Sequence, residues 1–318
     1  MWKSLVALAG VAISAAVSAQ TFPVKPIRFV STAIAGATDT VGRLIAHGLT
    51  ERVRQQVIID SRGGANGIIG TEIVARANPD GYTLLISTIS FAINLSIYAK
   101  LPYTPLADFA PISLVATTSG LFLIVHPSVS ARSVKDLIEL DTAKPGQISY
   151  GSAGVGNVTH MAGELFNIMA GTRLHHVPYK GAAAAFTDVL GAHVSMMFSG
   201  AIQCAPYVKS GKVRALGFTG MTRSKVLPDV PTLDELGLKG FDISSWYGLY
   251  APARTPQPII RYLRDSVVAI VREPQTSETL ESWGLTPVGS TPEQFGEFLK
   301  NEIAKYGKIV RAANIARS

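Results

Sequence analysis

Residues 148–160 read ISYGSAGVGNVTH, and this pattern decides the fold that we expect for the chain. Residues 148–150 predict a short strand, residues 151–156 a turn of small residues, and the apolar spacing beyond Asn157 a helix. The first N–H groups of a helix lack partners within the helix, and the helix dipole adds partial positive charge there. The turn therefore suits a carboxylate or a phosphate, although an ordinary strand-to-helix turn would explain it if it stood alone.

The same strand–turn–helix unit recurs along the chain. Its turns are at residues 35–39, 87–90, 151–156 and 198–201. In the first of them, Thr38 or Asp39 is placed to cap the following helix. Strands that alternate with helices predict a parallel sheet with helices on both faces, and ligands bind beyond the carboxyl ends of such strands. If two lobes face one another, the four turns converge on one cleft.

The chain of 318 residues is long enough for two hydrophobic cores. Prolines at positions 102, 105 and 111 end the first set of units, and apolar runs at 112–116 and 121–126 predict the crossing into a second lobe. Residues 245–251 predict a strand that returns to the first lobe. We expect an α/β protein of two lobes, each a mainly parallel sheet flanked by helices. The predicted bounds are 20–118 plus 228–318 for the first lobe and 119–227 for the second.

The N-terminal residues have the pattern of a secretory signal peptide. Lys3 precedes an apolar run at 5–17, and small residues lead up to Ala19. The run is too short for a comfortable transmembrane helix. We expect cleavage after Ala19 and a soluble, exported protein.

Charge and cysteine usage exclude several classes of protein. The formal net charge is +7, but the Lys and Arg residues are scattered, which argues against nucleic-acid binding. The single cysteine, Cys204, excludes a disulfide within the chain. No feature indicates an obligate protein partner, so we expect a monomer.

Catalytic, metal and cofactor motifs are not found in the sequence. Ser152 lies in Gly-Ser-Ala-Gly rather than Gly-x-Ser-x-Gly, and no sequence feature assigns it a histidine. His175 and His176 are adjacent on a predicted strand and so point to opposite faces, and the histidines lack metal-ligand spacing. We interpret them as ordinary surface or core residues, with His160 a partial exception because it lies one turn inside the helix. We expect neither an enzyme nor a cofactor.

Ten segments in order resemble the Bug family, the solute receptors of tripartite tricarboxylate transporters. They are residues 25–28, 35–40, 79–84, 108–115, 144–146, 150–154, 163–166, 176–181, 227–232 and 246–249. The resemblance covers essentially the whole chain after the leader. It implies a type II, Venus-flytrap binding protein of the periplasm that closes on a small carboxylate and delivers it to membrane transporter subunits.

The resemblance also implies which residues hold the ligand. In the first lobe they are Ala35, Gly36, Ala37, Thr38, Asp39, Ser87, Thr88 and Ser90. In the second lobe they are Ser152, Ala153, Gly154, Val155, Gly156, Asn157, Thr159, Tyr179, Lys180, Gly181 and Ser199. Whether Lys180 reaches a distal carboxylate or is only solvated stays open.

Two departures from the family pattern bear on the ligand. The resemblance implies that the first-lobe loop holds the ligand partly through ordered waters. This loop has Ala35 where the family has glycine, and its methyl group obstructs a close approach to the backbone. An acidic residue that is common after the strand at 194–198 is replaced by Ser199-Gly200. An ammonium group would then lack compensation, which favours mono- or dicarboxylates over amino acids.

Two questions stay open at this level. Phe91, Met197 and Phe198 could line an apolar or aromatic ligand, although core packing is the favoured role for at least two of them. A receptor for a membrane signalling system would use the same cleft, so it remains the alternative to transport.

Overall fold

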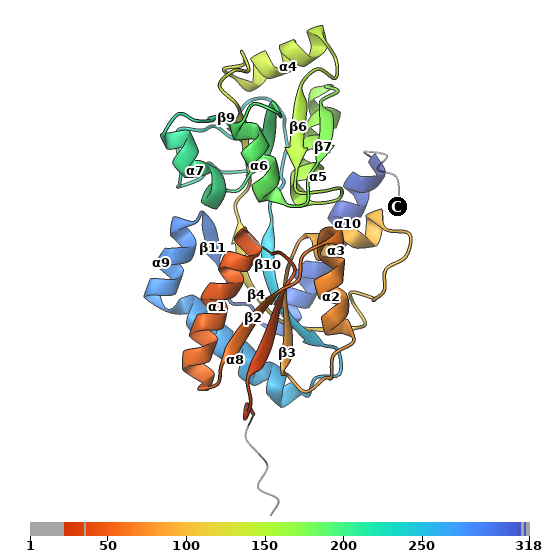
Figure 1. The fold of residues 1–318 in the computed structure, drawn as a ribbon, viewed down its shortest axis with the longest axis vertical. Helices are drawn as coiled ribbons and strands as arrows, with labels where there is room; N and C mark the ends of the chain where they lie inside the picture. Colours follow the sequence, from red (N-terminus) through yellow and green to blue (C-terminus); the bar gives the residue numbers. More distant parts are fainter. Residues whose placement is uncertain (1–21, 35, 313–314, 316–318) are drawn as a thin grey trace, which may run out of the picture.

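The computed structural model describes residues 22–34, 36–312 and 315, arranged as two lobes (Figure 1). Each lobe contains one sheet with helices on both faces, which confirms the predicted two-lobe α/β fold. The predicted leader at residues 1–19 and the predicted site residue Ala35 lie outside the described residues.

The first lobe contains the larger sheet, whose strand order is β11-β4-β10-β3-β1-β2. Its strands are β1 (Ile27–Ser31), β2 (Val57–Ser61), β3 (Thr83–Thr88), β4 (Phe109–Thr118), β10 (Trp246–Pro252) and β11 (Leu285–Pro287). The central strands β10 and β3 are almost wholly buried because helices cover both faces of the sheet.

The helices of the first lobe are divided between these two faces. One face carries α1 (Ala37–Val53), α8 (Gln257–Arg272) and α9 (Pro274–Ser282). The other face carries α2 (Ile68–Ala75), α3 (Ser90–Ile97) and α10 (Pro292–Ala312), with the short 3-10 helix η1 (Ala65–Gly67) before α2. Helix α1 shows why these helices pack on the sheet. Its apolar residues Val41, Ile45 and Leu49 recur at helical spacing, so they lie on one face, and all three are fully buried.

The second lobe contains a sheet in the order β7-β6-β8-β5-β9. Its strands are β5 (Phe122–Val125), β6 (Ser149–Ser152), β7 (His175–Pro178), β8 (Met196–Ser199) and β9 (Arg214–Phe218). Helices α4 (Val134–Ala143) and α5 (Val158–Ala170) pack on one face, and α6 (Ala182–Leu190) and α7 (Ala201–Lys209) on the other.

Most strands of each sheet run in the same direction, as predicted, but both sheets also contain antiparallel pairs. Strand β1 pairs in parallel with β2 and β3, but β10 is antiparallel to both β3 and β4. In the second sheet β6 pairs in parallel with β7 and β8, whereas β5 is antiparallel to β8 and β9. The physical reason is the direction of entry: β10 and β5 arrive from the other lobe and enter at the edge where the parallel strands end.

Two crossovers join the lobes, and they lie side by side. The Thr118 N–H donates to the Ser245 carbonyl at 2.7 Å, and the Thr219 N–H donates to the Leu121 carbonyl at 2.9 Å. The fully buried Thr219 hydroxyl donates to the Ile243 carbonyl and accepts from the Leu121 N–H. A Cβ on Gly220 would overlap the backbone carbonyl of Ser119.

The predicted lobe boundaries at 118/119 and 227/228 stay a prediction. Beyond residue 228, the Phe218 N–H of β9 donates to the Pro231 carbonyl, and the Leu233 N–H donates to the Phe218 carbonyl. This segment therefore lies against β9 of the second sheet before the chain crosses back.

None of the described helices is long and apolar enough to cross a membrane.

We predict that Gly220→Ala lowers the free energy of unfolding by about 1–3 kcal/mol, because the obstructing atom belongs to the backbone and cannot rotate away. Urea denaturation followed by circular dichroism measures the change. Gly296→Ala in α10 is the matched control: its Cβ would meet only Pro111 at 3.9 Å, so the helix gains roughly 0.5–1 kcal/mol. Equal stability of the two variants would contradict close packing of the crossovers.

Candidate ligand-binding cleft

The carboxyl edges of the two sheets face one another across the crossovers. In the first sheet, Thr88 at the end of β3 pairs with Tyr247, two residues beyond the crossover residue Ser245. In the second sheet, Ser199 at the end of β8 pairs with Phe122, one residue beyond Leu121. The strand register therefore directs the turns after β1, β3, β6, β7 and β8 toward the space between the lobes.

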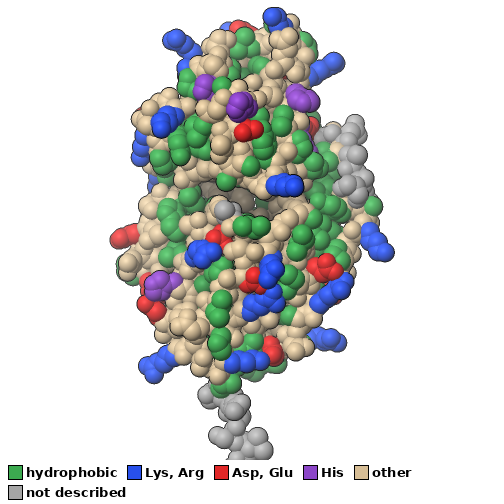
Figure 2. Space-filling model, in the orientation of Figure 1, with side chains coloured by type: hydrophobic (Ala, Val, Ile, Leu, Met, Phe, Trp, Pro, Cys, Tyr) green, Lys and Arg blue, Asp and Glu red, His purple; other side chains and the backbone are tan. Residues whose placement is uncertain are grey.

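This space is a cleft that the lobes border on both sides, and the space-filling view shows a hollow there (Figure 2). On one side, Gly156 of the second lobe lies directly against Ile97 of α3, so that a Cβ would overlap the Ile97 side chain. On the other side, a Cβ on Gly284 would lie 2.9 Å from the Cβ of Ala201 in α7. The candidate ligand site lies between these two contacts.

Most N–H groups of the turn at residues 152–157 already donate hydrogen bonds to acceptors within the turn or in α5. The Ala153 N–H donates to the Thr159 hydroxyl at 2.9 Å, and the Gly154 N–H donates to the Ser152 hydroxyl at 3.2 Å. The Gly156 N–H donates to Nδ1 of His160 at 3.0 Å. Only the Val155 N–H lacks a partner among the residues that the structure describes, and Val155 is exposed. The sequence predicted a turn rich in free donors, but most of these donors are bound.

Two side chains of this turn serve its own structure. Asn157 is the N-cap of α5, and its side-chain oxygen accepts from the Thr159 N–H at 3.1 Å. The Ser152 side chain is fully buried and lies 2.6 Å from Nε2 of His176. A ligand would therefore meet the backbone of the turn rather than these side chains.

The starts of α6 and α7 are more open than the start of α5. Their N-cap residues are Gly181 and Gly200, no side chain caps either helix, and a Cβ on either glycine would meet nothing within 4 Å. The Gln203 side chain links the two helices, because its Nε2 donates to the Ala182 carbonyl at 3.2 Å while its Oε1 accepts from Ser199. The sequence analysis placed the turn at 198–201 at the cleft but named only Ser199 of it as a site residue, and it missed Gln203. The glycine between a buried strand and a helix was a usable signal for Gly200.

Tyr179 and Lys180 differ in their surroundings. The Tyr179 hydroxyl donates to Asp188 at 2.6 Å. Partial burial, together with this carboxylate, raises the pKa of Tyr179 to about 12. Lys180 is exposed and forms no ion pair with any described residue. Lys180 is therefore available to an anion at the mouth of the cleft.

The first-lobe loop corrects one prediction. Neither Thr38 nor Asp39 caps α1; the N-cap is Gly36, at φ +92° and without a side-chain cap, and Ala37 and Thr38 form the first turn. The Asp39 carboxylate instead accepts from the Ser61 hydroxyl and from Arg43 Nε at 2.7 Å. It turns away from the helix start because these two donors attract it, and no described side chain caps the first N–H groups of α1.

Ser87, Thr88 and Ser90 lie at the end of β3 and the start of α3. Ser87 is buried beside Thr32, and the Ser90 hydroxyl donates to the side-chain oxygen of Asn66 at 2.9 Å. Sequence reasoning missed Asn66, which has a left-handed φ of +52° and lies close to Gly156 of the other lobe. The sequence feature that could have identified Asn66 is its position in Gly-Gly-Ala-Asn-Gly at residues 63–67.

The three residues considered for an aromatic ligand are all part of the hydrophobic cores. Phe91 stacks on Tyr250 with ring centroids 4.7 Å apart, Met197 packs in the core under α6 and α7, and Phe198 packs near Phe166. Each is at most 1% exposed.

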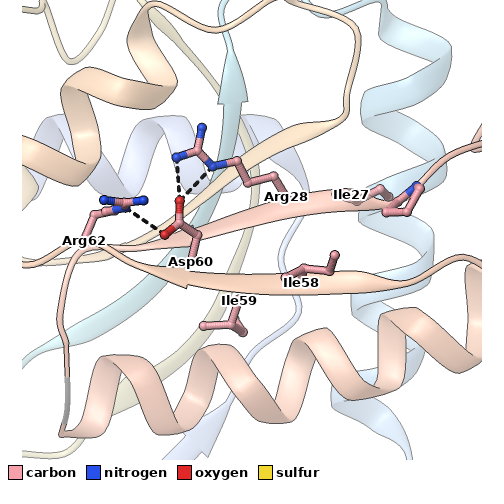
Figure 3. A pocket seen from close by; sticks show the side chains of 7 residues that line it. Ile27, Arg28, Ile58, Ile59, Asp60 and Arg62 are labelled. Carbon is pink, nitrogen blue, oxygen red and sulfur yellow. Dashed lines mark hydrogen bonds and ion pairs between the residues drawn. The ribbon is translucent and has the colours of Figure 1, made fainter.

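A separate depression lies at the open edge of the first sheet, around β1 and β2 (Figure 3). Arg28 and Arg62 both donate to the carboxylate of Asp60, Arg28 Nε at 2.8 Å and Arg62 Nε at 2.7 Å. Although partial burial acts to raise it, these bonds hold the pKa of Asp60 below its usual value. Because the two guanidinium groups are already engaged, this surface is a weaker candidate for an anion than the cleft.

Within the described ranges, no group of His, Cys, Asp and Glu side chains could hold a metal ion.

Comparison with known proteins agrees with this geometry. Residues 41–315 match the family model TctC, described as the tripartite tricarboxylate transporter family receptor. The solved periplasmic binding protein BugD is 32% identical, with a TM-score of 0.88 over 93% of this chain and all of that one. The chain is also similar to R. palustris Rpa4515 with adipate, at 31% identity and a TM-score of 0.90 over 93% of this chain and all of that one. MatC from Rhodopseudomonas palustris, with bound malate, is 28% identical and has a TM-score of 0.85 over 91% of this chain and all of that one.

These relatives are solute-binding receptors and not enzymes, as the sequence indicated. The family match spans most of the chain, and the similar structures share both lobes. The chain therefore belongs to the TctC family of tripartite tricarboxylate transporter receptors, the group to which the Bug proteins also belong.

Proposed function

We propose that the chain captures a small mono- or dicarboxylate in the cleft and delivers it to the membrane subunits of a tripartite tricarboxylate-type transporter. The observation that carries this proposal is the open start of three helices, α1, α6 and α7, at the edges that face the cleft. Free N–H groups and the helix dipole make such helix starts favourable for anions. Two similar receptors hold dicarboxylates, adipate in one and malate in the other.

The charges near the cleft favour an anion without an ammonium group. Lys180 is exposed and without an ion pair among the described side chains, so it can attract a carboxylate. Asp39, the acidic residue of the predicted site, already accepts hydrogen bonds from Arg43 and Ser61. A ligand ammonium would find little compensation there, and the core positions of Phe91 and Phe198 favour an aliphatic ligand over an aromatic one.

The periplasm is the compartment that we propose for this receptor, with residues 1–19 as the leader. Support comes from the family, whose member BugD is a periplasmic binding protein, and from the apolar run at 5–17. No feature of the described residues favours the signalling alternative.

We predict that small aliphatic carboxylates stabilise the mature protein, residues 20–318. At about a hundred times the dissociation constant, a ligand that binds only the folded state contributes about 2.7 kcal/mol. A thermal-shift panel of adipate, malate, benzoate and glutamate measures the effect, with chloride at equal ionic strength as the control. Stabilisation by glutamate alone would contradict the exclusion of amino acids, and no stabilisation by any carboxylate would count against the proposal.

A charge placed at the open start of α7 tests the cleft directly. Gly200 has φ −70° and room for a Cβ, so Gly200→Asp introduces no strain. We predict at least tenfold weaker binding of adipate or malate by calorimetry, equivalent to about 1.4 kcal/mol, because the new carboxylate repels the ligand.

Gly200→Asn is the matched control for this prediction, because it adds a side chain of the same size and shape and can cap the same helix without charge. Its affinity should fall less than that of the Asp variant. Equal affinities of the two variants would show that the start of α7 does not face the ligand.

A further inference from the structure

Two histidines lie directly behind the 152–157 turn, one on α5 and one on β7. The rings of His160 and His176 are stacked with centroids 4.0 Å apart and an interplanar angle of 19°. His160 is buried and His176 is half-buried. The sequence analysis interpreted His176 as an ordinary surface or core residue and made His160 a partial exception, but it did not pair the two.

Each histidine holds one N–H group of the turn. Nδ1 of His160 accepts directly from the Gly156 N–H at 3.0 Å. Nε2 of His176 lies 2.6 Å from the Ser152 hydroxyl, which in turn accepts from the Gly154 N–H at 3.2 Å. The amides on either side of Val155 therefore depend on the two histidines.

The bonding partners assign the protonation of His160. Since Nδ1 accepts a hydrogen bond, the proton of the neutral ring is on Nε2, which faces Glu164 Oε1 at 3.7 Å. Glu164 also accepts from the Tyr150 hydroxyl at 2.5 Å, and Tyr150 stacks on His176 with centroids 4.9 Å apart. A proton on Nδ1 of His160 would point at the Gly156 N–H and break that bond.

We propose that His160 and His176 are positioning residues for ligand capture. His160 binds the Gly156 amide and His176 holds the Ser152 hydroxyl that accepts from the Gly154 amide, so that the Val155 N–H between these amides faces the cleft. This inference rests on the proposed carboxylate-binding function. The two histidines act through the backbone of the turn and through Ser152, and they do not touch the ligand.

The pair also makes stability depend on pH. Burial, together with the neighbouring His176, lowers the pKa of His160 to about 3, and burial with the neighbouring His175 lowers that of His176 to about 4. In the unfolded chain both have pKa values near 6.5, so below that pH the unfolded state binds more protons. The free energy of unfolding should therefore fall as pH is lowered from 6.5 toward 4. Urea denaturation at pH 7.5, 6 and 5 measures this, and the double variant H160N/H176Q should show a smaller decrease.

The direct test measures adipate and malate binding by calorimetry at pH 7.5 in five single variants. We expect H160L and H176L to bind at least tenfold more weakly, because each removes an acceptor. H160N should restore most of the affinity, since the Asn side-chain oxygen takes the place of Nδ1, and H176Q should do so because the Gln amide reaches the place of Nε2. His175 is the matched control: it is exposed on the same strand, and H175L should bind like the wild type.

Hydrogen exchange of the Gly156 amide, followed by NMR without ligand, provides a readout independent of binding. Exchange should be faster in H160L than in the wild type and slow again in H160N. Unchanged affinity in H160L and H176L, or equal loss in H160L and H160N, would overturn the inference while leaving the proposed function intact. If the wild type binds no carboxylate, the proposed function fails together with the role in capture. Equal exchange rates of the Gly156 amide in the wild type and H160L would show that His160 does not hold the turn either.

Discussion

The packing of the two crossovers against each other determines how the rest of the molecule is arranged. Thr219 bonds to both neighbouring segments, and no side chain fits between Gly220 and the Ser119 carbonyl. The strands that leave this point, β5 and β10, enter their sheets at the edges where the parallel strands end. The starts of the helices that follow these parallel strands therefore face a single cleft.

Much of the fold could be predicted because strand and helix patterns are local. The predicted strand at 245–251 nearly coincides with β10 (Trp246–Pro252), and the turns after β1, β3, β6 and β8 were all placed at the correct edge. The sequence could not show that β10 inserts between β3 and β4, because its partners lie more than a hundred residues earlier. The short strand β11 was missed for a similar reason: its pairing with β4, and not its own pattern, makes it a strand.

The candidate site was predictable in position but not in the use of its donors. Small residues at 151–156 indicated exposed N–H groups, yet Thr159, Ser152 and His160 accept most of them. His176 could not be assigned to this turn, because only the parallel pairing of β6 with β7 brings it next to Ser152. Gly200 and Gly181, where no side chain caps the helix, are the more open sites, and only the three-dimensional structure distinguishes them from the turn at 152–157.

The position of β10 in the first sheet also determines the order in which the lobes can be completed during synthesis. The five strands of the second sheet come from one continuous segment, 122–218. The first sheet needs residues 246–252 between β3 and β4, and until they emerge from the ribosome both strands have unpaired edges. The lobe that is encoded later is thus the first that can fold to completion. The sheet of the N-terminal lobe stays incomplete, with unpaired edges on β3 and β4, until the last quarter of the chain has been synthesised.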